Sequence, residues 1–121
     1  RIERVGLREL IRNVVFAQRV ATPSITVEFD EDTPDIAADC DERLAAQALT
    51  NIVKNASESV IARVEGDAQN DAPGRIELIL RAVDDFAEIT ITDNGLGWPI
   101  VNRDRLTEPY MTTREDRKSV V

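Results

Sequence analysis

The sequence contains no histidine, and Cys40 is its only cysteine among 121 residues. The absence of histidine excludes a Ser-His-Asp triad, a histidine-ligated zinc site and a phosphohistidine formed within this chain. A single cysteine excludes an internal disulfide and a cysteine-rich metal site. No run of about 18 apolar residues is present, so we expect no transmembrane helix. The opening residues RIERVGLREL also lack the apolar core of a signal peptide.

Positive charge is also scarce, because 15 basic residues face 23 acidic residues and the net charge is −8. The acidic residues are spread along the chain, whereas binding to phosphate-rich surfaces needs a basic patch. We therefore expect neither nucleic acid nor direct contact with a membrane as the main interaction. The length and the apolar fraction of 42% fit one globular domain over residues 1–121.

Hydrophobic periodicity predicts two helices and four strands. The first part of the chain is expected to form a helix over 5–19 and then strands over 25–29 and 36–40. A long helix follows after an N-cap at Asp41. Strands over 75–83 and 86–92 come last and are joined by a hairpin at Asp84-Asp85. The expected apolar stripe of the long helix is Ala45, Ala48, Leu49, Ile52, Val53, Ala56 and Val60. This order predicts an α/β two-layer sandwich, in which both helices cover one face of a mixed sheet.

The stretch EITITDNGLGWP, residues 88–99, ends a predicted strand in an acid. Because side chains alternate along a strand, Asp93 falls on the same face as Ile89 and Ile91, which is the helix-covered face. A buried carboxylate costs several kcal/mol unless it has a partner. Gly95 and Gly97 remove side-chain bulk, so a flat or anionic ligand could approach closely. The structural alternative is a polar turn, in which Asp93 curls out into water.

Two further segments carry candidate ligand-binding groups. In LTNIVKNASES, Asn51 and Asn55 are four residues apart and share one helix face, at the border of the apolar stripe. Asparagine oxygens can ligate Mg²⁺, although both residues could equally be solvated helix polars. In LTEPYMTTR, residues 106–114, two threonines and an arginine could meet phosphate, although an ordinary loop explains the same residues.

In this order, the three segments resemble the ATP-binding domain of sensor histidine kinases, within the wider family of Hsp90, gyrase B and MutL ATPases. DERLAAQALTNIVKNASES resembles the asparagine box, DNGLG the first glycine box, and LTEPYMTTR the phenylalanine box, with Tyr110 where phenylalanine is usual. The amino-acid sequence of these segments is most similar to that of the nitrogen-regulation sensors of the NtrB and NtrY type. The resemblance covers about residues 5–114 and implies the Bergerat fold.

The resemblance implies a role for each matched residue. Asp93 would accept a hydrogen bond from the exocyclic amine of adenine, and Gly97 would let the backbone come close. Asn55 would hold Mg²⁺, and Asn51 would support the phosphates or the metal. The other residues expected to bind ATP or ADP are Gly95, Thr112, Thr113 and Arg114. Relatives that hydrolyse ATP have a glutamate base where this chain has Asn51. An amide cannot take a proton from water, so phosphoryl transfer is favoured over hydrolysis.

The resemblance also implies partners and a location. The γ-phosphoryl group would pass to a histidine on the dimerisation domain of the same kinase, and a response regulator would be an indirect partner. The domain would be cytoplasmic, within a membrane-anchored sensor. Because it contains no histidine, this chain could supply only the ATP-binding half of such a kinase.

The match to the family pattern ends after Arg114. A second glycine box of the form G-x-G-L-G-L and a final strand should follow, but the sequence continues as EDRKSVV. We therefore expect a domain that is incomplete at its C-terminal end, without the phosphate-binding helix and the last strand, and a sheet with an uncovered edge. The alternative function is an interaction module with the same fold that binds no nucleotide. An ATPase of the Hsp90 or MutL kind would need a glutamate at position 51.

Overall fold

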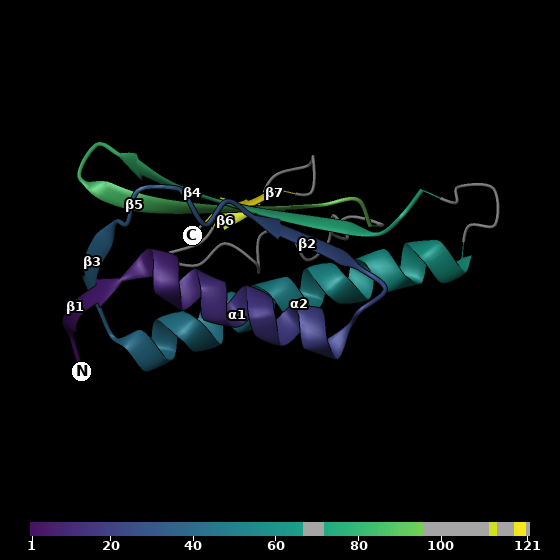
Figure 1. Ribbon diagram of the computed structural model, residues 1–121, viewed down its shortest axis with the longest axis horizontal. Coiled ribbons are helices and arrows are strands. Elements are labelled where there is room, and N and C mark those ends of the chain that lie inside the picture. The colour runs from purple at the N-terminus through teal and green to yellow at the C-terminus, as the bar shows by residue number, and fades with distance from the viewer. Residues whose placement is uncertain (67–71, 96–111, 114–117, 121) are drawn as a thin grey trace.

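The computed structural model describes residues 1–66, 72–95, 112–113 and 118–120. Two helices lie side by side across one face of a five-stranded sheet, as Figure 1 shows. The elements are β1 (Glu3–Gly6), α1 (Leu7–Ala21), β2 (Thr26–Phe29), β3 (Ala37–Cys40), α2 (Glu42–Gly66), β4 (Arg75–Val83), β5 (Phe86–Asp93), β6 (Thr112–Thr113) and β7 (Lys118–Val120). The predicted α/β two-layer sandwich is confirmed.

The main sheet has the strand order β2-β4-β5-β7-β6 and is mixed, as predicted. β2 runs parallel to β4, with Thr26 opposite Arg75. β4 and β5 form an antiparallel hairpin that closes at Val83 and Phe86. Asp84 in the turn has a φ of 54°, a conformation that aspartate tolerates better than most residues. The hairpin predicted at this position is confirmed.

The core lies between the sheet and the two helices. α1 contributes a stripe of buried residues at helical spacing, and β4 and β5 contribute alternate residues, as the period of a strand requires. The fully buried large side chains are Ile11, Leu49, Ile76, Leu78, Ile91, Val15, Val53 and Val60. In α2 the prediction was wrong at Ala48, which is exposed, and it missed Ser57 and Arg63, which are buried. No helix in the described ranges is long and apolar enough to cross a membrane.

The N-terminus of α1 is capped by a distant segment instead of by its own N-cap residue. Gly6 has no side chain to offer. The backbone N–H of Arg8 instead donates to Asp35 Oδ1 at 3.2 Å, and the N–H of Leu7 donates to the Ile36 carbonyl at 2.9 Å. The Arg8 guanidinium also donates to the Thr33 carbonyl at 3.1 Å. The segment between β2 and β3 therefore satisfies donors that a helix start leaves unpaired.

The N-terminus of α2 has the cap that the sequence predicts. Asp41 Oδ1 accepts a hydrogen bond from the Leu44 N–H at 3.1 Å.

Two strand pairings differ from the prediction. β3 was expected in the main sheet, but it pairs with β1 in a separate two-stranded sheet, with Glu3 opposite Cys40. β1 itself was not predicted, because a four-residue strand with one buried side chain leaves little periodicity to detect. Beyond β5, β7 pairs antiparallel with it, with Thr90 opposite Val120. β5 is therefore an inner strand along these residues, with β7 and β6 beyond it.

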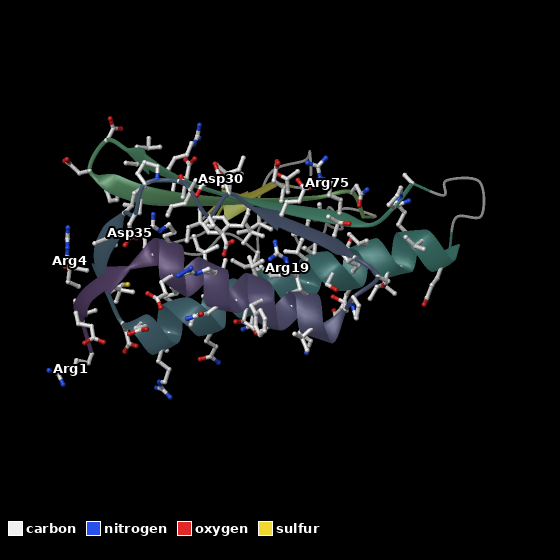
Figure 2. The ribbon with its side chains drawn as sticks, viewed as in Figure 1. Arg1, Arg4, Arg19, Asp30, Asp35 and Arg75 are labelled. Carbon is white, nitrogen blue, oxygen red and sulfur yellow. The ribbon has the colours of Figure 1, made fainter. Side chains whose placement is uncertain are left out.

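β2 is the outermost strand on the opposite side of the main sheet. Its Val27 carbonyl accepts two hydrogen bonds from Arg19 of α1, at 3.0 Å from Nε and 2.7 Å from the terminal nitrogen. In Figure 2 the Arg19 side chain reaches from α1 towards this strand. The outer edge of β2 is thus bonded to a helix side chain.

Candidate functional site

The carboxyl end of β5 buries a charged side chain. Asp93 stands opposite Ile76 of β4 in the strand register, and it is 7% exposed. Its face is the helix-covered face, as the alternation with Ile89 and Ile91 predicts. The Gly95 N–H donates to Asp93 Oδ1 at 2.7 Å. The prediction that Asp93 is buried is confirmed, and the alternative in which it curls out into water is wrong.

Gly95 lies directly against α2. A Cβ atom at this position would lie 2.4 Å from Ser59 Oγ, 2.5 Å from the Ser59 carbonyl carbon and 2.6 Å from the Val60 nitrogen. The absent side chain therefore leaves room for the backbone of α2. The structure thus gives this glycine a packing reason, besides the close approach of a ligand that the sequence predicts.

Asn51 and Asn55 lie on the same side of α2 as the contact with Gly95. Both side chains are exposed. They continue at intervals of four residues to Ser59, and four residues correspond to about 6 Å along a helix axis. One row of α2 side chains therefore runs from Asn51 through Asn55 to Ser59, which contacts the turn after Asp93.

The remaining predicted residues are placed only in part. Gly97 and Arg114 lie outside the residues that the structure describes. Thr112 and Thr113 form β6, which pairs with β7 at the edge of the sheet opposite β2. The structure thus brings together Asp93, Gly95 and Ser59, the last residue of the row that begins at Asn51. It does not bring Thr112 and Thr113 into this group.

Two shallow depressions lie away from this region. One, of about 370 Å³, surrounds the end of β2, and its lining includes Arg19, Glu28 and Asp30. The other, of about 580 Å³, lies at the start of α2 and is lined partly by Glu42 and Arg43. Of the predicted site residues that the structure describes, none lines either depression. Within the described ranges no group of three or more cysteine, aspartate or glutamate side chains could hold a metal ion.

Cys40, the only thiol, is not part of this region. It ends β3 and is half-buried. Its pKa is raised above the ordinary value of 9.0, first by burial and then by the negative charges of Asp41 and Asp39. The thiol therefore stays protonated at neutral pH and is a poor nucleophile.

Two residues of the site were missed in the sequence. Asn94, next to Asp93, bonds to the start of β4, donating to the Pro73 carbonyl at 2.8 Å and accepting from the Arg75 N–H at 2.9 Å. Ser59 lies against Gly95. The only sequence signal for Ser59 was its place four residues after Asn55. Asn94 had no distinctive signal, because asparagine before glycine is common in any turn.

This chain is similar to known proteins both in sequence and in fold. Residues 40–120 match the family described as histidine kinase-, DNA gyrase B-, and HSP90-like ATPase. The nitrogen regulation protein NtrY of Azorhizobium caulinodans is 43% identical over 115 residues, which are 94% of this chain and 14% of that protein. This chain therefore spans about a seventh of the length of that relative.

Two solved structures share the fold. The nucleotide-free catalytic domain of histidine kinase ThkA superposes with a TM-score of 0.70 and 19% identity, covering 99% of this chain and 91% of that one. ThkA in complex with response regulator protein TrrA gives a TM-score of 0.68 and 18% identity, covering 98% of this chain and 40% of that one. The fold is the Bergerat fold of histidine kinase ATP-binding domains. With its match over residues 40–120, which include every predicted site residue, this chain belongs to the family of histidine kinase-, DNA gyrase B- and HSP90-like ATPases.

Proposed function

We propose that this chain is the ATP-binding catalytic domain of a two-component sensor histidine kinase of the nitrogen-regulation type. It would bind Mg-ATP and transfer the γ-phosphoryl group to a histidine on a separate dimerisation domain. The observation that carries the proposal is the buried carboxylate of Asp93, in a strand end that packs on α2 at Ser59, in the helix row that also holds Asn51 and Asn55. Membership of the ATPase family and the likeness to NtrY support it.

In this proposal Asp93 recognises the base. A carboxylate is an acceptor, and the exocyclic amine of adenine is a donor. Asp93 already accepts the Gly95 N–H, so one carboxylate would both shape the turn and read the base. Gly97 is proposed to let the backbone approach the nucleotide, as a residue without a side chain can.

The donor chemistry of α2 fits magnesium bound together with phosphate. Mg²⁺ usually keeps several waters and takes only one or two protein oxygens besides phosphate oxygens. The exposed amide of Asn55 can supply one such oxygen, and Asn51 can contact a phosphate or the metal. Bound magnesium would neutralise charge on the phosphates. The other proposed phosphate contacts are Thr112, Thr113 and Arg114.

The proposed reaction is phosphoryl transfer, in which the bond from the γ-phosphorus to the bridging oxygen breaks and a bond to an imidazole nitrogen forms. This chain has no histidine, so the acceptor belongs to the dimerisation domain. Asn51 cannot act as a base for water, which disfavours hydrolysis. A response regulator would receive the phosphoryl group from that histidine and so be an indirect partner. The proposal implies a cytoplasmic location within a membrane-anchored sensor, because ATP is supplied there.

Calorimetric titration of the chain with ADP, with and without Mg²⁺, tests the proposal. The matched variant is Asp93→Asn, which keeps an acceptor oxygen for the Gly95 N–H but loses the charge. We expect magnesium-dependent binding that this variant weakens about 10- to 100-fold, since a hydrogen bond to a charged group contributes about 1.5–3 kcal/mol. No binding by a chain that circular dichroism shows to be folded would contradict the proposal and support an interaction module that binds no nucleotide.

A further inference from the structure

Asn94 joins the end of β5 to the start of β4 through both polar atoms of its side-chain amide. Its Oδ1 accepts from the Arg75 N–H at 2.9 Å, and its Nδ2 donates to the Pro73 carbonyl at 2.8 Å. Its own backbone N–H donates to the Arg75 carbonyl at 3.3 Å. Three hydrogen bonds therefore hold the residue that lies between the buried Asp93 and the turn at Gly95.

The segment that Asn94 bonds to is itself fixed to α2. The buried Arg63 donates to the Ala72 carbonyl at 2.6 Å. Gly74 lies so close to Val60 that a Cβ atom there would be 2.4 Å from its Cγ1. Asn94 is thus bonded to a segment that cannot shift without disturbing the core.

The backbone around Asp93 is consequently held from two directions. Asn94 bonds it to the first residues of β4, and Gly95 packs it against α2. The carboxylate of Asp93 lies between these two attachments and accepts the Gly95 N–H. With the Asn94 amide removed, the strand end would keep its contact with α2 but lose its side-chain attachment to β4.

We infer that Asn94 is a positioning residue for base recognition, which holds the Asp93 carboxylate where it meets the exocyclic amine of adenine. This inference rests on the proposed function. A shorter side chain cannot span the Arg75 N–H and the Pro73 carbonyl together. Aspartate at this position keeps the acceptor for Arg75 but places a carboxylate against the Pro73 carbonyl, where a donor is needed.

The test compares ADP with inosine diphosphate, which carries the same phosphates but lacks the exocyclic amine. Binding of each nucleotide to the chain is measured by calorimetry for the parent, Asn94→Ala and Asn94→Asp. We expect Asn94→Ala to weaken ADP binding about tenfold, the loss expected for one misplaced hydrogen bond to a charged group. Binding of inosine diphosphate should change less than about twofold, since it makes no such bond. The ratio of the two affinities is the decisive readout, because a loss of stability alone lowers both affinities together.

Gln18→Ala is the matched control. It also removes an amide hydrogen bond, which Gln18 donates to Thr22 Oγ1 at 2.7 Å at the end of α1, and it should leave the ratio unchanged. Asn94→Asp keeps the inference testable if Asn94→Ala does not fold, because any added charge repulsion acts equally on two diphosphates. An unchanged ratio in the Asn94 variants, with ADP still bound by the parent, would overturn this inference alone. A parent that binds no ADP would overturn the proposed function and the inference together.

Discussion

Replacing Gly95 by alanine tests the contact between the end of β5 and α2. The added Cβ would lie 2.4 Å from Ser59 Oγ and within 2.6 Å of two backbone atoms of α2. These separations are about 1 Å shorter than an ordinary contact of about 3.5 Å. A hydroxyl can rotate away, but the backbone of a helix inside the core cannot. α2 and the end of β5 would therefore have to separate.

The expected cost follows from the kind of atom that must move. Overpacking a core site typically costs about 1–3 kcal/mol, and we expect the upper end, about 3 kcal/mol, because two of the three atoms belong to a helix backbone. For a domain of this length, 3 kcal/mol corresponds to a melting temperature lower by about 12 °C. Urea denaturation followed by far-ultraviolet circular dichroism measures the free energy of unfolding.

Two other glycines provide graded controls. At Gly66, which ends α2, an added Cβ would meet no atom within 4 Å, so Gly66→Ala should leave stability unchanged or raise it by up to about 1 kcal/mol. At Gly74 the nearest atom is a side-chain methyl of Val60 at 2.4 Å, so Val60→Ala should partly offset the cost of Gly74→Ala. Ser59→Ala should not rescue Gly95→Ala. If Gly95→Ala were as stable as Gly66→Ala, the packing of Gly95 on α2 would be refuted.

Two further perturbations follow from other contacts. Asp35→Ala should lower the free energy of unfolding by about 1 kcal/mol, because it removes the acceptor for the Arg8 N–H at the start of α1. Asp32→Ala, at an exposed aspartate on the same segment, is the control. Equal urea midpoints for the two variants would contradict the cap. Cys40 should react slowly with iodoacetamide at pH 7 and faster at higher pH, because burial raises its pKa above 9.0. The folded state holds this proton more tightly, so the thiol's contribution to stability is present below pH 9.0 and is lost as the pH rises through the folded pKa. Rapid alkylation at pH 7, at the rate of a cysteine in urea, would be inconsistent with that shift.

The sequence predicts the buried position of Asp93 because alternation along a strand is a local property. Val27, Ile89 and Ile91 carry the same kind of information, since each side chain's face follows from its neighbours in sequence. The cap at Asp41 was predictable for the same reason, because its acceptor and the Leu44 N–H are three residues apart. The family resemblance added the ordered motifs, which single residues could not supply.

Contacts between distant segments were not predictable in this way. Asp35 caps α1 from 27 residues away, and Asn94 bonds to residues 19 and 21 positions earlier. The packing of Gly95 on α2 was not predicted, because nothing local shows that α2 passes beside it. Cys40 and its neighbours form a strand as expected, yet the choice of β1 as partner depends on where α1 begins.

The two hydrogen bonds from Arg19 to Val27 bear on how this domain behaves at high concentration. An outermost strand is a template on which another polypeptide can add as a further strand, and aggregation often begins there. A second chain pairing with β2 would have to displace a guanidinium that already occupies the Val27 carbonyl. The side chain that fastens α1 to the sheet thereby also discourages copies of the domain from joining edge to edge, and it does so without a proline or a bulge in the strand.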